Sequence, residues 1–130
     1  MKFYRIPTKQ EEQLIELLVH KSSLEMSEDW KNGLLVCPMD DGEMGSLYLF
    51  PQGKINESRK LGRQISEFQF TDIDGVEVIA SLNVDVDGVL FELDIWKTNF
   101  EKLVKLPRLL PWHVIEIFLS VRVVFYIIVR

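Results

Sequence analysis

The sequence predicts an α+β domain in which an N-terminal helix packs on a twisted antiparallel β-meander of about four to six strands. Three observations lead to this class. Apolar residues recur at helical spacing over 8–21, whereas from residue 34 onward they alternate with polar residues, as in half-buried strands. Asp-Gly turns then separate the later alternating segments, as tight hairpins require. The chain has 130 residues, so we expect a single domain, 1–130.

The helix is expected over 8–21 because its first turn contains a capping box. In Thr8-Lys9-Gln10-Glu11, the Thr8 hydroxyl accepts a hydrogen bond from the Glu11 amide, and the Glu11 carboxylate accepts one from the Thr8 amide. Apolar residues then form one stripe: Leu14, Ile15, Leu17 and Leu18. The pattern predicts an amphipathic helix with one buried face.

Five segments have the composition of short strands: 34–37, 46–50, 64–70, 76–84 and 89–96. They are rich in β-branched and aromatic residues, and turn residues separate them. The Asp-Gly pairs at 74–75 and 87–88 predict hairpin turns between the last three segments.

The C-terminal part combines a short helix with a strongly apolar segment. The helix is expected near 98–106, because capping residues precede it and Pro107 ends it. Residues 108–130 are mostly apolar, but Glu116 and Arg122 interrupt them, so no uncharged run approaches the ~20 residues that cross a bilayer. We therefore expect a buried helix or strand, with a dimer surface and a membrane-seeking end as the alternatives.

The chain is acidic, and its charge is unevenly placed. It carries 15 Lys and Arg against 20 Asp and Glu, a formal net charge of −5. The acidic excess lies before residue 107, whereas the apolar C-terminal segment has a basic excess. An acidic surface repels phosphate backbones, so we expect no direct nucleic-acid binding, and it attracts basic proteins. The simpler interpretation is that the charge maintains solubility.

No catalytic motif is present, so we expect a protein that is not an enzyme and needs no cofactor. Cys37, His20 and His113 are the Cys and His residues of the chain, and no Asp or Asn lies at a recognised spacing from them. Cys37 follows an apolar run, which predicts an inert buried thiol. A single cysteine fits a reducing compartment and no signal peptide is evident, so the expected location is cytoplasmic.

The segment 83–94 has some features of a calcium loop. Asn83, Asp85 and Asp87 stand at the first three ligand positions. The twelfth position, however, is Asp94 rather than Glu, and both flanks have the pattern of strands, whereas a calcium loop of this type lies between two helices. We interpret the segment as a hairpin turn and expect no metal site.

The acidic turns are the candidate functional surface. If they lie at one edge of the sheet, they form a patch for a basic partner, made of Asp40, Asp41, Glu43, Asp72, Asp74, Asp85 and Asp87. Asp is also favoured in turns for its local backbone hydrogen bonds, so a structural role is the competing interpretation. Trp30, Trp96 and Trp112 are the candidate apolar anchors of such an interface.

Parts of the chain resemble a family of small, uncharacterised bacterial proteins. The resemblance is carried by the helix pattern of 5–17, by Phe70-Thr71-Asp72-Ile73-Asp74-Gly75-Val76, and above all by SLNVDVDGVLFELDIWKTNFEKLVKLP at 81–107. It covers 5–107 and implies an α+β domain, whereas the apolar segment 108–130 departs from the family pattern.

Proteins of this size, charge and type also resemble immunity proteins encoded beside bacterial toxins, including those of contact-dependent growth inhibition systems. The resemblance implies a protein that binds a cognate basic toxin domain, an RNase or DNase being the expected class, and blocks its active site. Two alternatives stay open: a calcium- or small-ligand-binding domain that uses 83–94, and a non-catalytic scaffold that forms homodimers through its apolar tail.

Overall fold

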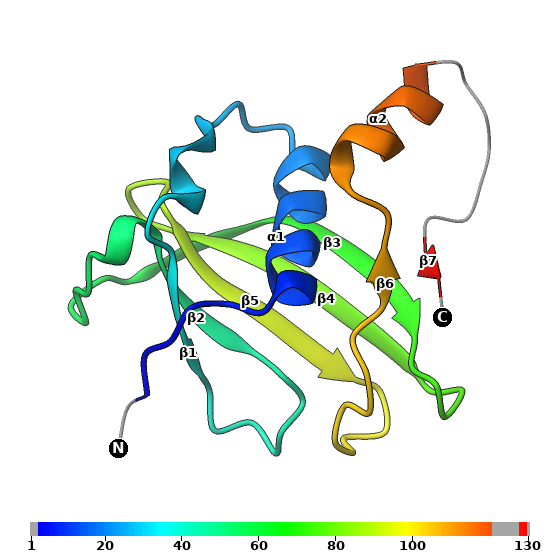
Figure 1. The fold of residues 1–130 in the computed structure, drawn as a ribbon. Coiled ribbons are helices and arrows are strands. Elements are labelled where there is room, and N and C mark those ends of the chain that lie inside the picture. Colours follow the sequence, from blue (N-terminus) through cyan, green and yellow to red (C-terminus); the bar gives the residue numbers. More distant parts are fainter. Residues whose placement is uncertain (1–2, 121–127, 130) are drawn as a thin grey trace.

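The computed structural model describes residues 3–120 and 128–129, which form an α+β fold (Figure 1). Its helices are α1 (Lys9–Lys21) and α2 (Trp112–Ser120), with short 3₁₀ turns η1 (Glu28–Lys31) and η2 (Pro51–Gly53). Its main strands are β1 (Leu35–Pro38), β2 (Leu47–Phe50), β3 (Leu61–Thr71), β4 (Glu77–Asp85) and β5 (Leu90–Lys97). Two short strands, β6 (Arg108–Leu109) and β7 (Ile128–Val129), pair with each other. The predicted class is confirmed, with an N-terminal helix on a five-stranded antiparallel sheet.

The order of the strands differs from a simple meander. The strand order is β1-β2-β5-β4-β3. In a simple meander β3 would lie beside β2, but here β5 occupies that position. The hairpins β3–β4 and β4–β5 are as expected. The connection after β2 is not a tight turn: η2 and the mostly polar residues 54–60 carry the chain to the far edge of the sheet. Strand β5 therefore pairs with β2 directly, with Leu47 opposite Leu93 and Tyr48 opposite Glu92.

Helix α1 covers one face of the sheet and forms the core with it. The predicted capping box is present, since Thr8 Oγ1 accepts from the Glu11 amide at 3.1 Å and Glu11 Oε1 accepts from the Thr8 amide at 2.8 Å. The apolar stripe of α1 is buried, and Leu14 and Leu18 are completely enclosed. Opposite them β4 contributes Val78, Ala80, Leu82 and Val84, all buried in the same cluster. Alternation along β4 therefore sends every second side chain into this core.

The short helix expected near 98–106 is wrong, because these residues form neither helix nor strand. The backbone amides of Val104 and Lys105 donate to the carboxylate of Asp72, at 2.7 and 3.1 Å, and not to carbonyls one helical turn earlier. Phe100 also has a φ of 62°, which lies outside the right-handed helical region. The Asp72 carboxylate therefore accepts the hydrogen bonds that these amides would have donated within a helix.

The apolar segment after residue 108 contributes to the core in its described part. Leu109 of β6 and Ile115 of α2 are both buried with the α1 residues. Within the described ranges, no helix combines the length and apolar character needed to cross a lipid bilayer. The expectations for 121–127 and 130 lie outside the described residues, as does the side chain of Trp112.

Candidate functional site

One face of the sheet has no helix over it in the described part of the chain. Helices α1 and α2 lie on the same side of the sheet (Figure 1). Since Val78, Ala80 and Leu82 face α1, alternation and strand register place the intervening residues and their partners on the opposite face. We call this surface the open face: Tyr48, Glu67, Gln69, Glu77, Ile79, Ser81, Asn83, Glu92, Asp94 and Trp96.

The open face is acidic. It contains the carboxylates of Glu67, Glu77, Glu92 and Asp94, and among the described residues none of these pairs with a Lys or Arg. The five strands contain Arg63 and Lys97 as their basic residues, and both are in register with core residues that face α1, Val84 and Val78. Apart from Asp85, which is buried at the end of β4 and pairs with Arg59, the strands thus place their negative charge on one side and their positive charge on the other.

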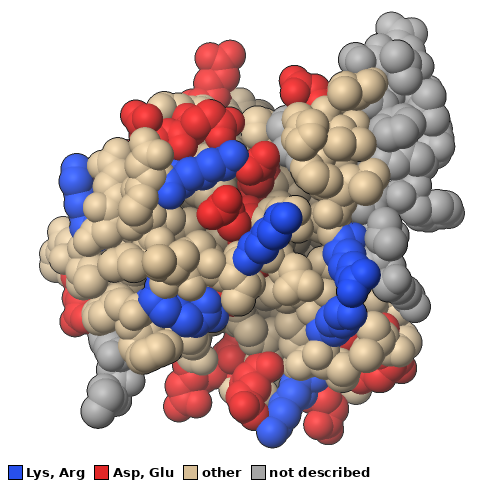
Figure 2. Space-filling view, in the orientation of Figure 1, with Lys and Arg blue, Asp and Glu red and all other residues tan. Residues whose placement is uncertain are grey.

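The α1 side has a different character. Figure 2 shows basic and acidic side chains interspersed over it. Several are paired, such as Lys31 with Glu16 and Glu28. A mixed and paired surface attracts a charged partner weakly, whereas unpaired charges of one sign on the open face produce a directed field.

Aromatic side chains lie at both ends of β5 on the open face. Trp96 is 42% exposed, and its ring centroid is 6.0 Å from that of Phe100, which is 71% exposed. Near the other end, Tyr48 is 37% exposed, and its ring lies 6.5 Å from Phe91. Exposed aromatic rings of this kind are enriched at protein-binding surfaces.

The residue after Trp96 anchors this end of the sheet from the inside. Lys97 points into the protein with no exposed surface, and its Nζ donates to Asp72 Oδ2 at 2.9 Å, to Asp74 and to the carbonyl of Lys102 at 3.0 Å. We call Lys97, Asp72 and Asp74 the Lys97 cluster. It joins β5 to the β3–β4 turn and to residues 98–105, which carry Phe100.

The members of the Lys97 cluster stabilise one another as ions. Burial disfavours the ammonium of Lys97, but the hydrogen bonds to Asp74 and Asp72 outweigh it and raise the pKa of Lys97. Burial likewise opposes ionisation of Asp72, but hydrogen bonds from the Val104 amide and Lys97 outweigh it and lower its pKa. The hydrogen bond from Lys97 also lowers the pKa of Asp74. All three groups are therefore charged at neutral pH.

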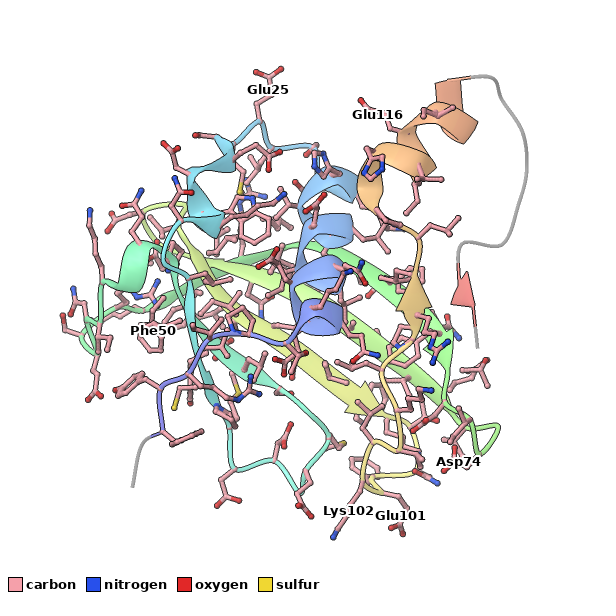
Figure 3. All side chains as sticks on the ribbon, viewed as in Figure 1. Glu25, Phe50, Asp74, Glu101, Lys102 and Glu116 are labelled. Atoms are coloured by element: carbon pink, nitrogen blue, oxygen red, sulfur yellow. The ribbon has the colours of Figure 1, made fainter. Side chains whose placement is uncertain are left out.

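The acidic turns predicted as one patch lie at two ends of the sheet. The loop with Asp40, Asp41 and Glu43 lies at the Trp96 end, as does the turn with Asp72 and Asp74 (Figure 3 labels Asp74). The turn with Asp85 and Asp87 lies at the opposite end, because successive hairpin turns alternate between the ends of a sheet. The sequence pattern did not distinguish the two ends.

Three of the predicted contact residues are buried. Trp30 is 5%, Asp72 1% and Asp85 4% exposed, so their side chains are not available to a partner in this structure and we remove them from the predicted surface. The Asp85 carboxylate instead accepts from the amides of Asp87 and Val89 and fixes the turn. The exposed members are Asp40, Glu43, Asp74, Asp87 and Trp96, with Asp41 half-buried, and their contact role stays a prediction.

The sequence reasoning missed the open-face carboxylates. Glu67, Glu77, Glu92 and Asp94 lie within strands, whereas the acidic patch predicted from the sequence consists of turn residues. The signal was present in Glu92-Leu93-Asp94-Ile95-Trp96, whose alternation places two carboxylates and an indole on one face. Which face is uncovered, however, follows only from the positions of the helices.

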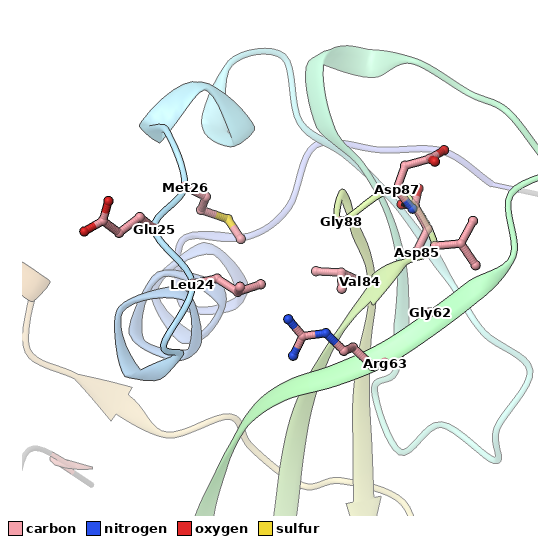
Figure 4. A pocket seen from close by; sticks show the side chains of 10 residues that line it. Leu24, Glu25, Met26, Gly62, Arg63, Val84, Asp85, Asp87 and Gly88 are labelled. Atoms are coloured by element: carbon pink, nitrogen blue, oxygen red, sulfur yellow. Dashed lines mark hydrogen bonds between the residues drawn. The ribbon is translucent and has the colours of Figure 1, made fainter.

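Cavities at the other end of the sheet have mixed linings. One of about 620 Å³ opens between the loop after α1 and the β4–β5 turn (Figure 4). Arg63 reaches into it and Glu25 points away from it, while Leu24 and Met26 line one wall. In the described part of the chain, no three His, Cys, Asp or Glu side chains converge as a metal site would require. Residues 83–94 form the end of β4, a tight turn and most of β5, so the predicted hairpin turn is confirmed.

The comparisons with known proteins identify a family. A family model described as a domain of unknown function (DUF6984) matches residues 4–107. No match was found among curated proteins or among solved structures. The matched range contains α1, the whole five-stranded sheet and the residues held by the Lys97 cluster, whereas β6 and α2 lie beyond it. The chain therefore belongs to the family described as domain of unknown function DUF6984.

Proposed function

We propose that this protein binds a basic protein domain through its open face and neutralises it, as an immunity protein neutralises a toxin. The observation that carries the proposal is the separation of charge across the sheet. Glu67, Glu77, Glu92 and Asp94 share one face without a Lys or Arg from the strands, and Trp96 is exposed at the end of that face.

Such a face suits fast and tight association with a basic partner. Carboxylates of one sign attract the partner from a distance and orient it, which mainly raises the association rate. Exposed aromatic rings supply apolar area that is buried on contact, which mainly slows dissociation. The open face offers both, since Trp96 and Tyr48 lie among its carboxylates.

The proposed mechanism is occlusion of a nuclease active site in the cytoplasm. A nuclease binds phosphates in a basic cleft, and side-chain carboxylates are complementary to the same cleft. A bound acidic face therefore competes directly with RNA or DNA. The inhibitor itself needs no catalytic group or cofactor for this role.

The acidity of the open face also bears on the homodimer alternative. A twofold dimer places the same patch of each copy against the other. Contact through the open face would bring the unpaired carboxylates of two copies together, and like charges placed opposite one another are destabilising. The charge pattern therefore favours a basic partner over a second copy at this face.

The test is co-purification with the polypeptide encoded immediately upstream, followed by a nuclease assay on that polypeptide. The open-face variant is E67Q/D94N, which removes two exposed charges. Its matched control, E25Q/E116Q, removes two exposed charges far from the Trp96 end (Figure 3). We expect nanomolar inhibition by the wild type and the control, and inhibition at least ~10-fold weaker for the open-face variant. Absence of binding by the wild type, or equal loss in both variants, contradicts the proposal.

A further inference from the structure

Phe100 has a backbone conformation that is unfavourable for its side chain. Its φ is 62°, in the left-handed region that glycine adopts freely and bulky residues rarely adopt. Its ring is 71% exposed, so burial in the core does not compensate for this strain. Glycine would relieve this backbone strain, so the ring contact with Trp96 is what the side chain of Phe100 adds to the fold.

The surroundings of Phe100 hold it in this conformation. Its amide donates to the carbonyl of Lys97 at 2.8 Å. After it, the amide of Leu103 donates to the carbonyl of Glu43 at 3.2 Å, and Asp72 accepts from the next two amides. These hydrogen bonds hold the backbone on both sides of Phe100, and a strained conformation persists where the surroundings fix it in this way.

The turn presents the Phe100 ring beside Trp96 at the end of the open face. The two rings are 6.0 Å apart and inclined by 55°. Acidic residues lie near them: Asp94 is two positions before Trp96 on the same face, Glu101 follows Phe100, and Asp74 lies at the same end (Figure 3). The result is an exposed aromatic pair at an end of the sheet that carries several carboxylates; the exposed Lys102, labelled beside Glu101, pairs with Glu43 at 2.7 Å.

We propose that Phe100 and Trp96 act together as the apolar anchor of the interface. The pair enters an apolar cavity on the basic partner, and Lys or Arg residues around that cavity face Asp74, Asp94 and Glu101. This inference rests on the proposed function and adds to it the residues that determine affinity. Aromatic anchors in fully desolvated pockets contribute most of the binding energy in interfaces of this kind, and surrounding polar contacts exclude water.

The decisive variant is Phe100→Gly, because it separates anchoring from folding. Glycine relieves the left-handed strain, so the melting temperature is expected to stay constant or to rise by a few degrees, ~2–5 °C. Affinity for the upstream-encoded polypeptide is expected to fall at least ~10-fold, mainly through faster dissociation. Phe100→Ala, which removes the ring and keeps the strain, is expected to lose similar affinity without any gain in melting temperature.

The matched control is Gln52→Gly. Gln52 has nearly the same φ, 61°, and lies in η2 at the other end of β2, away from Trp96. Its variant is expected to show the same small stabilisation with unchanged affinity. If Phe100→Gly binds as well as the wild type, or if it melts well below the wild type, the anchor role is refuted. Failure of the wild type to bind the polypeptide refutes the proposed function as well, so the two failures are distinguishable.

Discussion

Lys97 Nζ lies 2.9 Å from Asp72 Oδ2, and neither side chain is exposed to solvent. The pair connects residues 25 positions apart in the sequence. Because strands alternate, the buried cation is next to Trp96, which points to the other face of the sheet. Two neighbouring residues of β5 therefore have different roles: Lys97 forms the ion pair that holds residues 98–105, and Trp96 is the exposed ring that we propose as part of the interface.

Removing the buried carboxylate is expected to destabilise the fold strongly. Asp72→Asn leaves Lys97 with Asp74 as its remaining anion and weakens the bonds to the Val104 and Lys105 amides, so we expect a loss of about 3 kcal/mol in the free energy of unfolding. Urea denaturation followed by circular dichroism measures this loss. An unchanged urea midpoint contradicts the structural role of the pair.

Removing both charges is expected to cost less than the two single changes together. Lys97→Met alone strands Asp72 as a buried, uncompensated charge, whereas the double variant K97M/D72L has neither charge. Urea denaturation of the wild type, K97M, D72L and K97M/D72L gives the coupling free energy between the two side chains. Additive effects of the two single changes indicate that the pair is not coupled.

The pH dependence of stability follows from the pKa directions. The pKa values of Asp72 and Asp74 are lowered by folding, so their contribution is present above the unfolded pKa of about 3.9 and is lost as the pH falls through the folded values. The pKa of Lys97 is raised, so its contribution is present below about 10.4 and is lost as the pH rises through the folded value.

A stability plateau is therefore expected between about pH 5 and pH 9, with losses on both sides. Melting curves at a series of pH values measure it. The Asp72→Asn variant is the control, and its acid limb is expected to be shallower than that of the wild type. Identical acid limbs in the two proteins contradict the assignment.

The capping box of α1 gives a smaller and local prediction. Thr8→Ala removes the acceptor of the Glu11 amide, and we expect a loss of about 1 kcal/mol. Thr8→Ser keeps the hydroxyl and is expected to remain within about 0.5 kcal/mol of the wild type. Thermal unfolding distinguishes the two variants, and equal stability of Thr8→Ala and Thr8→Ser contradicts the capping role.

The bulge at the start of β3 requires glycine for a steric reason. A Cβ at Gly62 would lie 2.4 Å from the carbonyl oxygen of Asp85, which belongs to the neighbouring strand backbone. Gly62→Ala is therefore expected to cost about 2 kcal/mol. The same change at Gly88 serves as a contrast, since no atom lies within 4 Å of a Cβ there and its cost arises from the φ of 83° alone. Urea midpoints of the two variants test the difference, and a neutral Gly62→Ala variant contradicts this explanation.

Local signals made much of the fold predictable from the sequence. The capping box determines where α1 begins, and alternation with Asp-Gly turns determines the hairpins of β3, β4 and β5. The pairing of β2 with β5 joins residues more than forty positions apart, and no local pattern encodes it. The prediction of a helix near 98–106 is wrong for the same reason, because the amides of Val104 and Lys105 donate to Asp72, which lies in a turn more than thirty residues earlier.

The candidate site was predictable only in part. Asp72 and Asp74 have the same turn chemistry in the sequence, yet one is buried in an ion pair and the other is exposed. Trp30 and Trp96 likewise differ only through packing. The alternation of Glu92, Asp94 and Trp96 was readable, but the absence of a described helix over their face depends on tertiary structure.

We propose that the unpaired carboxylates of the open face attract a basic partner. Stopped-flow association rates with the upstream-encoded polypeptide, measured from low to high ionic strength for the wild type, E67Q/D94N and E25Q/E116Q, test it most directly. We predict that the wild-type rate falls at least ~10-fold between about 50 and 500 mM salt, that the control behaves alike, and that E67Q/D94N starts lower with a flatter dependence. A wild-type rate that does not change with salt, or the same salt dependence in all three proteins, contradicts the claim.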